Sequence, residues 1–165
     1  GRFSVRMETT IETRRQAIED IAALPARMRE AVSGLGDTEL DTPYRPGGWS
    51  VRQLAHHVAD SHMNGYIRLK LALTEANPTV KPYEQEHWAN LSDSRLPIAL
   101  SLNILDGVHA RWTTLWRAMG EPEFERTFNH PELGPLTTHI HAHLYGWHSR
   151  HHVAHITALR QREGW

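Results

Sequence analysis

The stretch His139-Ile-His-Ala-His-Leu-Tyr-Gly-Trp-His-Ser-Arg-His-His-Val-Ala-His155 carries seven of the 13 histidines in this 165-residue chain. Tyr145 within it, and Ile156 and Leu159 after it, follow the three- and four-residue spacing of one helical face. We therefore expect one long helix here, beginning near Thr137 or Thr138 and ending before Gly164. An apolar face of this kind normally packs against other helices, so the stretch points to a helical bundle.

Histidines spaced four apart in this stretch suggest a metal site. His148 and His152 form one such pair, and His151 and His155 form another. Two imidazoles on one helical face can hold one metal ion, and a third ligand from another helix leaves an open position for chemistry. His148 and His152 share the apolar face, where they are either hydrogen-bonded core residues or metal ligands. Spacing alone leaves open the first pair, the second pair, or a mixed set that includes His155.

The rest of the chain predicts three more long helices. Their expected ranges are 11 to 32, with a kink or a new start at Pro25; about 51 to 74, after a Ser50–Gln53 capping box; and about 97 to 119. Residues 77 to 97 are the least regular part, and 121 to 135 form a second long connection, with a short extended pair around Phe124–Phe128. This pattern predicts an all-α four-helix bundle in which residues 1–165 form a single domain.

Composition narrows the function classes. Lys plus Arg number 18 and Asp plus Glu number 19, so we expect no nucleic-acid partner. The chain has no cysteine, so His, Asp or Glu must hold any metal. No apolar stretch is long enough to span a membrane, and residues 1–5 lack the apolar core of a signal peptide. We expect a soluble, cytoplasmic protein.

A third ligand could come from the predicted second helix, which carries His56, His57 and His62. Periodicity places His62 on the apolar face more naturally than His57. Asp60 could be a ligand, an orienting carboxylate or a surface charge. The three alternating histidines at 139, 141 and 143 diverge around a helix, so we expect them to form a wet helix entrance or part of a pocket rim.

Several segments together resemble the YfiT group of the DinB superfamily. They are Tyr44-Arg-Pro-Gly-Gly-Trp-Ser-Val-Arg-Gln-Leu-Ala-His-His-Val-Ala-Asp-Ser-His-Met-Asn64, Leu105-Asp-Gly-Val-His-Ala-Arg-Trp112 and Trp147-His-Ser-Arg-His-His-Val-Ala-His-Ile156. The resemblance implies a four-helix bundle, a homodimer, and one divalent metal ion per subunit bound by three histidines. Imidazole ligands suit zinc or nickel, so we expect one of these metals. His57-Val-Ala-Asp60 matches the second-helix motif of the family, so the implied ligands are His57, His148 and His152.

The same resemblance implies a metal-dependent hydrolase that activates water for attack on a small-molecule substrate. An alternative is an S-transferase that conjugates bacillithiol or a similar low-molecular-weight thiol to electrophiles. Either reaction needs a proton carrier, for which His62 and His155 are the candidates. A metal- or ligand-binding bundle without turnover is the third possibility.

Overall fold

The computed structural model describes residues 10–165 and is mostly helical. The four long helices are α1 (Ile11–Val32), α3 (Val51–Thr74), α5 (Ala99–Ala118) and α7 (Thr138–Glu163). The short elements are α2 (Asp37–Leu40), α4 (Gln85–Trp88), the 3-10 helix η1 (Ser92–Arg95), α6 (Glu121–Phe124) and a hairpin of β1 (Thr127–His130) and β2 (Gly134–Thr137). The predicted four-helix bundle is confirmed. The expectation for residues 1–5 lies outside the described residues.

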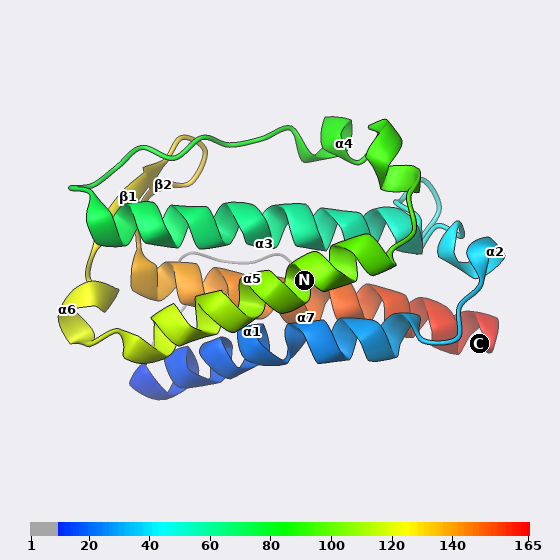
Figure 1. Cartoon of the computed structure of the whole chain (residues 1–165), viewed down its shortest axis with the longest axis horizontal. Helices are drawn as coiled ribbons and strands as arrows, with labels where there is room; N and C mark the ends of the chain where they lie inside the picture. The colour runs from blue at the N-terminus through cyan, green and yellow to red at the C-terminus, as the bar shows by residue number, and fades with distance from the viewer. Residues whose placement is uncertain (1–9) are drawn as a thin grey trace.

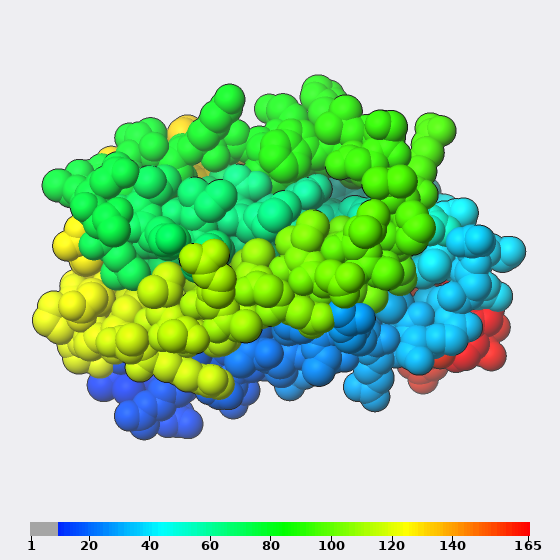
Figure 2. Space-filling model, in the orientation of Figure 1, coloured from blue at the N-terminus to red at the C-terminus, as the bar shows by residue number. Residues whose placement is uncertain are grey.

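The helices do not alternate in direction along the chain. In Figure 1, α1 and α7 run one way, and α3 and α5 run the other way. α1 packs on α5 and α7, and α3 packs on the same two helices. Because α3 and α5 are parallel neighbours, the chain must return along α3 before α5 begins. The connection 75–98 runs back along α3 in Figure 1, and in Figure 2 its green atoms lie along the upper edge of the molecule, above those of α3.

Side chains at the helix ends account for the predicted boundaries. At the start of α3, the Gln53 amide donates to Ser50 Oγ at 3.1 Å and the Ser50 amide donates to Gln53 Oε1 at 3.0 Å. Thr137 Oγ1 accepts from the Ile140 amide at the start of α7. Gly164, with φ of 78°, ends α7 in the left-handed conformation that glycine adopts without strain. The expected limits of α3 and α7 are confirmed.

At Pro25, one of the two expected alternatives is excluded, because α1 continues through this residue as one helix and no new helix starts there. A second local expectation was wrong. The extended pair is not around Phe124–Phe128, because Phe124 ends α6 and stacks on Trp116 at 6.1 Å. The strands instead pair Thr127 with Thr137 and His130 with Gly134.

The apolar core has two main parts, one toward each end of the bundle. Leu24, Val58, Leu105 and Ile156 belong to one, while Ile21, Leu69, Trp112 and Tyr145 belong to the other. His62 and His109 are buried and fall between members of the two parts in sequence. The bundle therefore carries a polar layer between two apolar halves. No helix within residues 10–165 is long and apolar enough to cross a membrane.

Candidate metal centre

Three histidines from two antiparallel helices meet at one point. His57 of α3 faces His148 and His152 of α7, and one ring nitrogen from each lies within 4.8 Å of the others. The Nε2 atoms of His148 and His152 are 3.1 Å apart. Among the described residues, no Asp or Glu joins this group.

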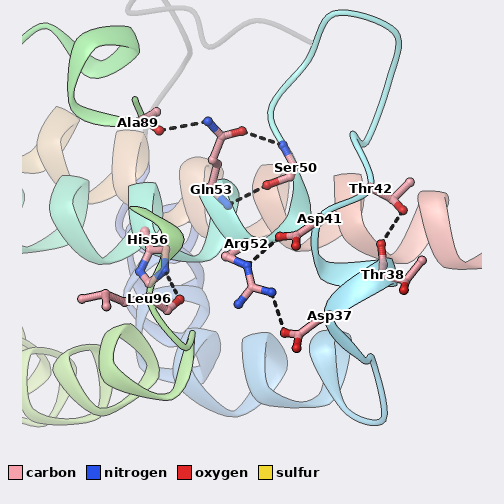
Figure 3. A network of polar contacts seen from close by, with 10 residues as sticks. All are labelled: Asp37, Thr38, Asp41, Thr42, Ser50, Arg52, Gln53, His56, Ala89 and Leu96. Atoms are coloured by element: carbon pink, nitrogen blue, oxygen red, sulfur yellow. Dashed lines mark hydrogen bonds and ion pairs between the residues drawn. The ribbon is translucent and has the colours of Figure 1, made fainter. Parts of the chain in front are cut away.

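Side-chain hydrogen bonds anchor the start of α3, the helix that carries His57, to the neighbouring segments (Figure 3). Arg52 donates to Asp41 at 2.6 Å and to Asp37 at 2.7 Å. Gln53 Nε2 donates to the Ala89 carbonyl at 2.9 Å. The neighbouring His56 contacts Ser101 Oγ at 2.7 Å and the Leu96 carbonyl at 3.0 Å. His56 therefore links α3 to α5 and η1 and takes no part in the centre.

The three imidazoles are neutral near pH 7. Burial lowers the pKa of His57 to about 4. Burial also lowers the pKa of His148 and His152 well below the usual value, with a further contribution from neighbouring histidines. His152 Nδ1 is buried without a hydrogen-bond partner. Neutral imidazoles keep a lone pair for coordination, so the donor set fits a divalent transition-metal ion.

A chain of hydrogen bonds sets the tautomer of His148. His109 Nδ1 lies 2.6 Å from the Ile21 carbonyl oxygen, so Nδ1 carries the proton. His109 Nε2 then accepts from His62 Nδ1–H at 3.0 Å, and His62 Nε2 accepts from His148 Nδ1–H at 3.0 Å. Burial lowers the pKa of His109 to about 4 and that of His62 well below the usual value, which keeps the chain neutral. His148 Nε2 is left with its lone pair directed toward the centre.

The chain of hydrogen bonds begins at the Ile21 carbonyl, which lacks its usual partner within α1 because of Pro25. In a regular helix, the Ile21 carbonyl would accept from the amide four residues later. Residue 25 is a proline and has no N–H, so this carbonyl needs another donor. His109 of α5 supplies that donor. The residue expected to kink α1 thus frees the carbonyl that orients the histidine chain.

A cavity of about 360 Å³ opens beside the three histidines. The Trp49 ring lies 4.5 Å from that of His57, and Trp49 Nε1 donates to Glu86 Oε2 at 2.9 Å. His155 also lines the cavity and stacks on Tyr44 at 4.3 Å. Aromatic rings therefore surround the coordinating nitrogens on the accessible side.

The other candidate residues have different surroundings. Periodicity correctly placed His62 inside, but both of its nitrogens are occupied, and His57 is buried as well. Asp60 lies outside the three-residue group, and burial and Asp93 raise its pKa to about 6. His141 is not at a wet entrance as expected, because it is buried and donates from Nε2 to the Gly65 carbonyl at 2.9 Å.

The role of His109 was not predicted from the sequence. The signal was present, because His109 continues the three- and four-residue spacing of Leu102, Leu105, Trp112 and Trp116 in α5. A histidine on such a face must be buried and hydrogen-bonded. Its partner, however, is a carbonyl 88 residues earlier in the chain, which spacing within α5 does not reveal.

The largest cavity described is not the histidine site. It measures about 730 Å³ and lies around Arg52, Gln53 and Arg95. Arg52 is already paired with Asp37 and Asp41. The smaller cavity is lined by three imidazoles that can hold one metal ion, so it is the stronger candidate for chemistry.

Comparisons with known proteins identify relatives of this chain. Residues 20–156 match the family model of the DinB superfamily. A protein of Bacillus cereus strain B4264, named "Putative metal-dependent hydrolase", is 51% identical over 165 residues, covering 100% of this chain and 95% of the relative. The structure of YfiT from Bacillus subtilis, described as "a probable metal-dependent hydrolase with an unusual four-helix bundle topology", matches with a TM-score of 0.94 at 44% identity, over 100% of this chain and 95% of that one.

A more distant structure shares the fold alone. TT2238, described as a four-helix bundle protein, matches with a TM-score of 0.58 at 18% identity, over 88% of this chain and 98% of that one. The family match, the identity to the Bacillus relatives and the shared bundle topology agree with one another. The chain belongs to the YfiT group of the DinB superfamily.

Proposed function

We propose that this protein is a metal-dependent hydrolase of small molecules, with one divalent ion held by His57, His148 and His152. The observation that carries the proposal is the convergence of three neutral imidazoles beside a cavity. No fourth His, Asp or Glu of residues 10–165 completes the group. Three protein ligands with an open position are typical of catalytic rather than structural zinc sites. The names of the Bacillus relatives support the same activity.

When bound, the ion would supply Lewis acidity that activates water at neutral pH. The other roles fall to the chain itself. His62 holds His148 in one tautomer and has no nitrogen left for substrate, so we assign it to positioning. His155 lines the cavity, and burial lowers its pKa to about 4, so it is a neutral candidate proton acceptor. Trp49, restrained by Glu86, lines the cavity and packs beside the ring of His57.

Metal analysis of single variants tests the ligand set. We expect His57→Ala, His148→Ala and His152→Ala each to lose stoichiometric zinc or nickel, because each removes one of three ligands. His151→Ala is the matched control, because His151 lines the same cavity but does not belong to the group. Elemental analysis after dialysis gives the readout. Full metal content in all three ligand variants would overturn the proposed site.

The reaction is tested on the metal-loaded protein with ester and amide substrates, alongside conjugation of bacillithiol to model electrophiles. We expect metal-dependent hydrolysis that is lost in His57→Ala. Thiol conjugation without hydrolysis would replace the hydrolase with an S-transferase. Bound metal without turnover in either assay would favour a binding protein. The single domain, the homodimer and the cytoplasmic location remain predictions.

A further inference from the structure

A second cavity adjoins the histidine centre. It measures about 400 Å³ and shares His148, Gln85 and Glu86 with the first. Its lining also includes Ser61 and Arg68 of α3. A molecule bound in the second cavity could therefore extend to the coordinating histidines.

Arg68 differs from the other buried arginines in lacking a carboxylate partner. Arg14, Arg52 and Arg68 are 5%, 8% and 9% exposed. Arg14 pairs with Glu121, and Arg52 pairs with two aspartates. Arg68 donates from Nη2 to the Lys81 carbonyl at 2.9 Å, while its Nε is buried without a partner. No carboxylate of residues 10–165 forms an ion pair with it. Burying an unpaired charge is costly, so this arginine is suited to a charge that the ligand supplies.

The charge of Arg68 acts on the groups around it. His130 lines the same cavity. Its pKa is lowered mainly by burial and secondly by the positive charge of Arg68. Arg68 also contributes to the lowered pKa of His141. Glu84 and Glu132 line the cavity but do not pair with Arg68. The guanidinium is therefore a local positive centre inside a cavity that also carries acidic groups.

The position of Arg68 on α3 directs a ligand toward the centre. His57, Ser61 and Arg68 are spaced by four and seven residues, so they lie along one helical face. At 1.5 Å per residue, the backbones of His57 and Arg68 are about 16 Å apart along the axis. His148, one of the coordinating histidines, lines the same cavity as Arg68. A small molecule held at Arg68 therefore extends along this face toward the coordinating histidines.

We propose that Arg68 binds a carboxylate of the substrate, and that the bond to be cleaved lies at the other end of the molecule, near the three histidines. The assignment of the reacting end rests on the proposed function, whereas carboxylate binding at Arg68 does not. One guanidinium in a cavity that is also lined by glutamates favours a singly charged carboxylate over a doubly charged phosphate. The substrate class is thus a small carboxylic acid with a hydrolysable group remote from its carboxylate.

Titration of the metal-free protein with benzoate, benzamide and inorganic phosphate tests the subsite. Without the ion, a carboxylate cannot bind by coordinating metal. We expect benzoate to shift the Arg68 Nε–H signal in NMR spectra and to bind about tenfold or more tightly than benzamide, because it forms charge-assisted hydrogen bonds. Arg68→Gln should lose this preference, and Arg68→Lys should keep part of it. Arg95→Gln is the control, because Arg95 is exposed and lines the other large cavity.

Two outcomes overturn the subsite: an unshifted Arg68 Nε–H signal in the wild-type protein, or phosphate binding more tightly than benzoate. The wild-type signal decides the question even if Arg68→Gln does not fold. His57→Ala should still bind benzoate through Arg68. Benzoate binding without metal-dependent hydrolysis would leave the subsite standing and remove the proposed function. Hydrolysis without benzoate binding at Arg68 would leave the proposed function standing and remove the subsite.

Discussion

At the scale of the residue, His109 and His56 are both buried and both contact a backbone carbonyl, but their other contacts differ. His109 donates to the Ile21 carbonyl and continues through His62 to His148. His56 contacts the Leu96 carbonyl and Ser101, and its contacts end there. Comparing variants of His109 and His56 therefore distinguishes a histidine that orients a metal ligand from one that only stabilises the fold.

We expect His109→Phe to weaken zinc binding about 10- to 100-fold, as losses of partners that orient metal ligands usually do. The variant leaves His62 without its acceptor, so the tautomer of His148 is no longer set. Competition with a chelator gives the affinity. His109→Gln, which keeps a donor and an acceptor, should recover part of it. His56→Phe should lower stability without changing zinc affinity, and equal losses in both phenylalanine variants would contradict the orienting role.

Residue types and spacing indicated a metal site on α7 but did not choose its ligands. Spacing left His148 with His152 and His151 with His155 both open, and the resemblance decided for the first pair. His57 came from resemblance, because periodicity favoured His62. Both histidines are buried, and what separates them is the partner: His62 contacts His109 and His148, while His57 faces the cavity. The spacing of apolar residues within one helix predicts which side chains are buried. It does not predict which residue of a neighbouring helix a ring nitrogen contacts.

At the scale of the element, α1 and α7 approach closely at Gly146. A Cβ atom on Gly146 would lie 2.8 Å from Ala17 Cα and 2.9 Å from the Ala17 carbonyl oxygen. Both are backbone atoms, so a side chain at this position must move a helix. Gly107 of α5 offers a comparison, because nothing lies within 4 Å of a Cβ added there.

We expect Gly146→Ala to destabilise the protein by about 1–3 kcal/mol, the usual cost of overpacking a core. Gly107→Ala should be neutral or stabilising by about 0.5–1 kcal/mol, because alanine favours a helix interior. Urea unfolding measures both. Ala17→Gly should not rescue Gly146→Ala, because the Cα and carbonyl oxygen of residue 17 remain. Similar free energies of unfolding for the two alanine variants would contradict the close approach.

Element limits were predictable wherever local chemistry decides them. The Ser50–Gln53 cap and Gly164 are such cases. The short β-hairpin was misplaced because residues around 124–128 read as extended locally, whereas Phe124 packs on Trp116 from a distant helix. Pro25 was expected to kink α1 or to start a new helix, but α1 is continuous and the carbonyl that Pro25 frees is satisfied by α5. In both cases, contacts with a residue distant in the sequence determine the local structure.

At the scale of the whole molecule, the buried histidines between and beside the two apolar halves make folding depend on pH. Burial lowers the pKa of His109 and of His141 to about 4 in the folded protein. The ordinary value, which applies when the chain is unfolded, is about 6.5. Between these values the unfolded chain binds more protons than the folded protein, so the free energy of unfolding rises with pH.

We therefore expect the metal-free protein to have its full stability above about pH 6.5 and to lose it as the pH falls toward 4. Each such histidine contributes a slope of up to about 1.4 kcal/mol per pH unit. Urea unfolding between pH 7.5 and 5 measures the slope. His109→Gln should make it shallower by about one proton, because residue 109 no longer titrates. Stability that stays level over this range would mean that these histidines are not buried as neutral groups.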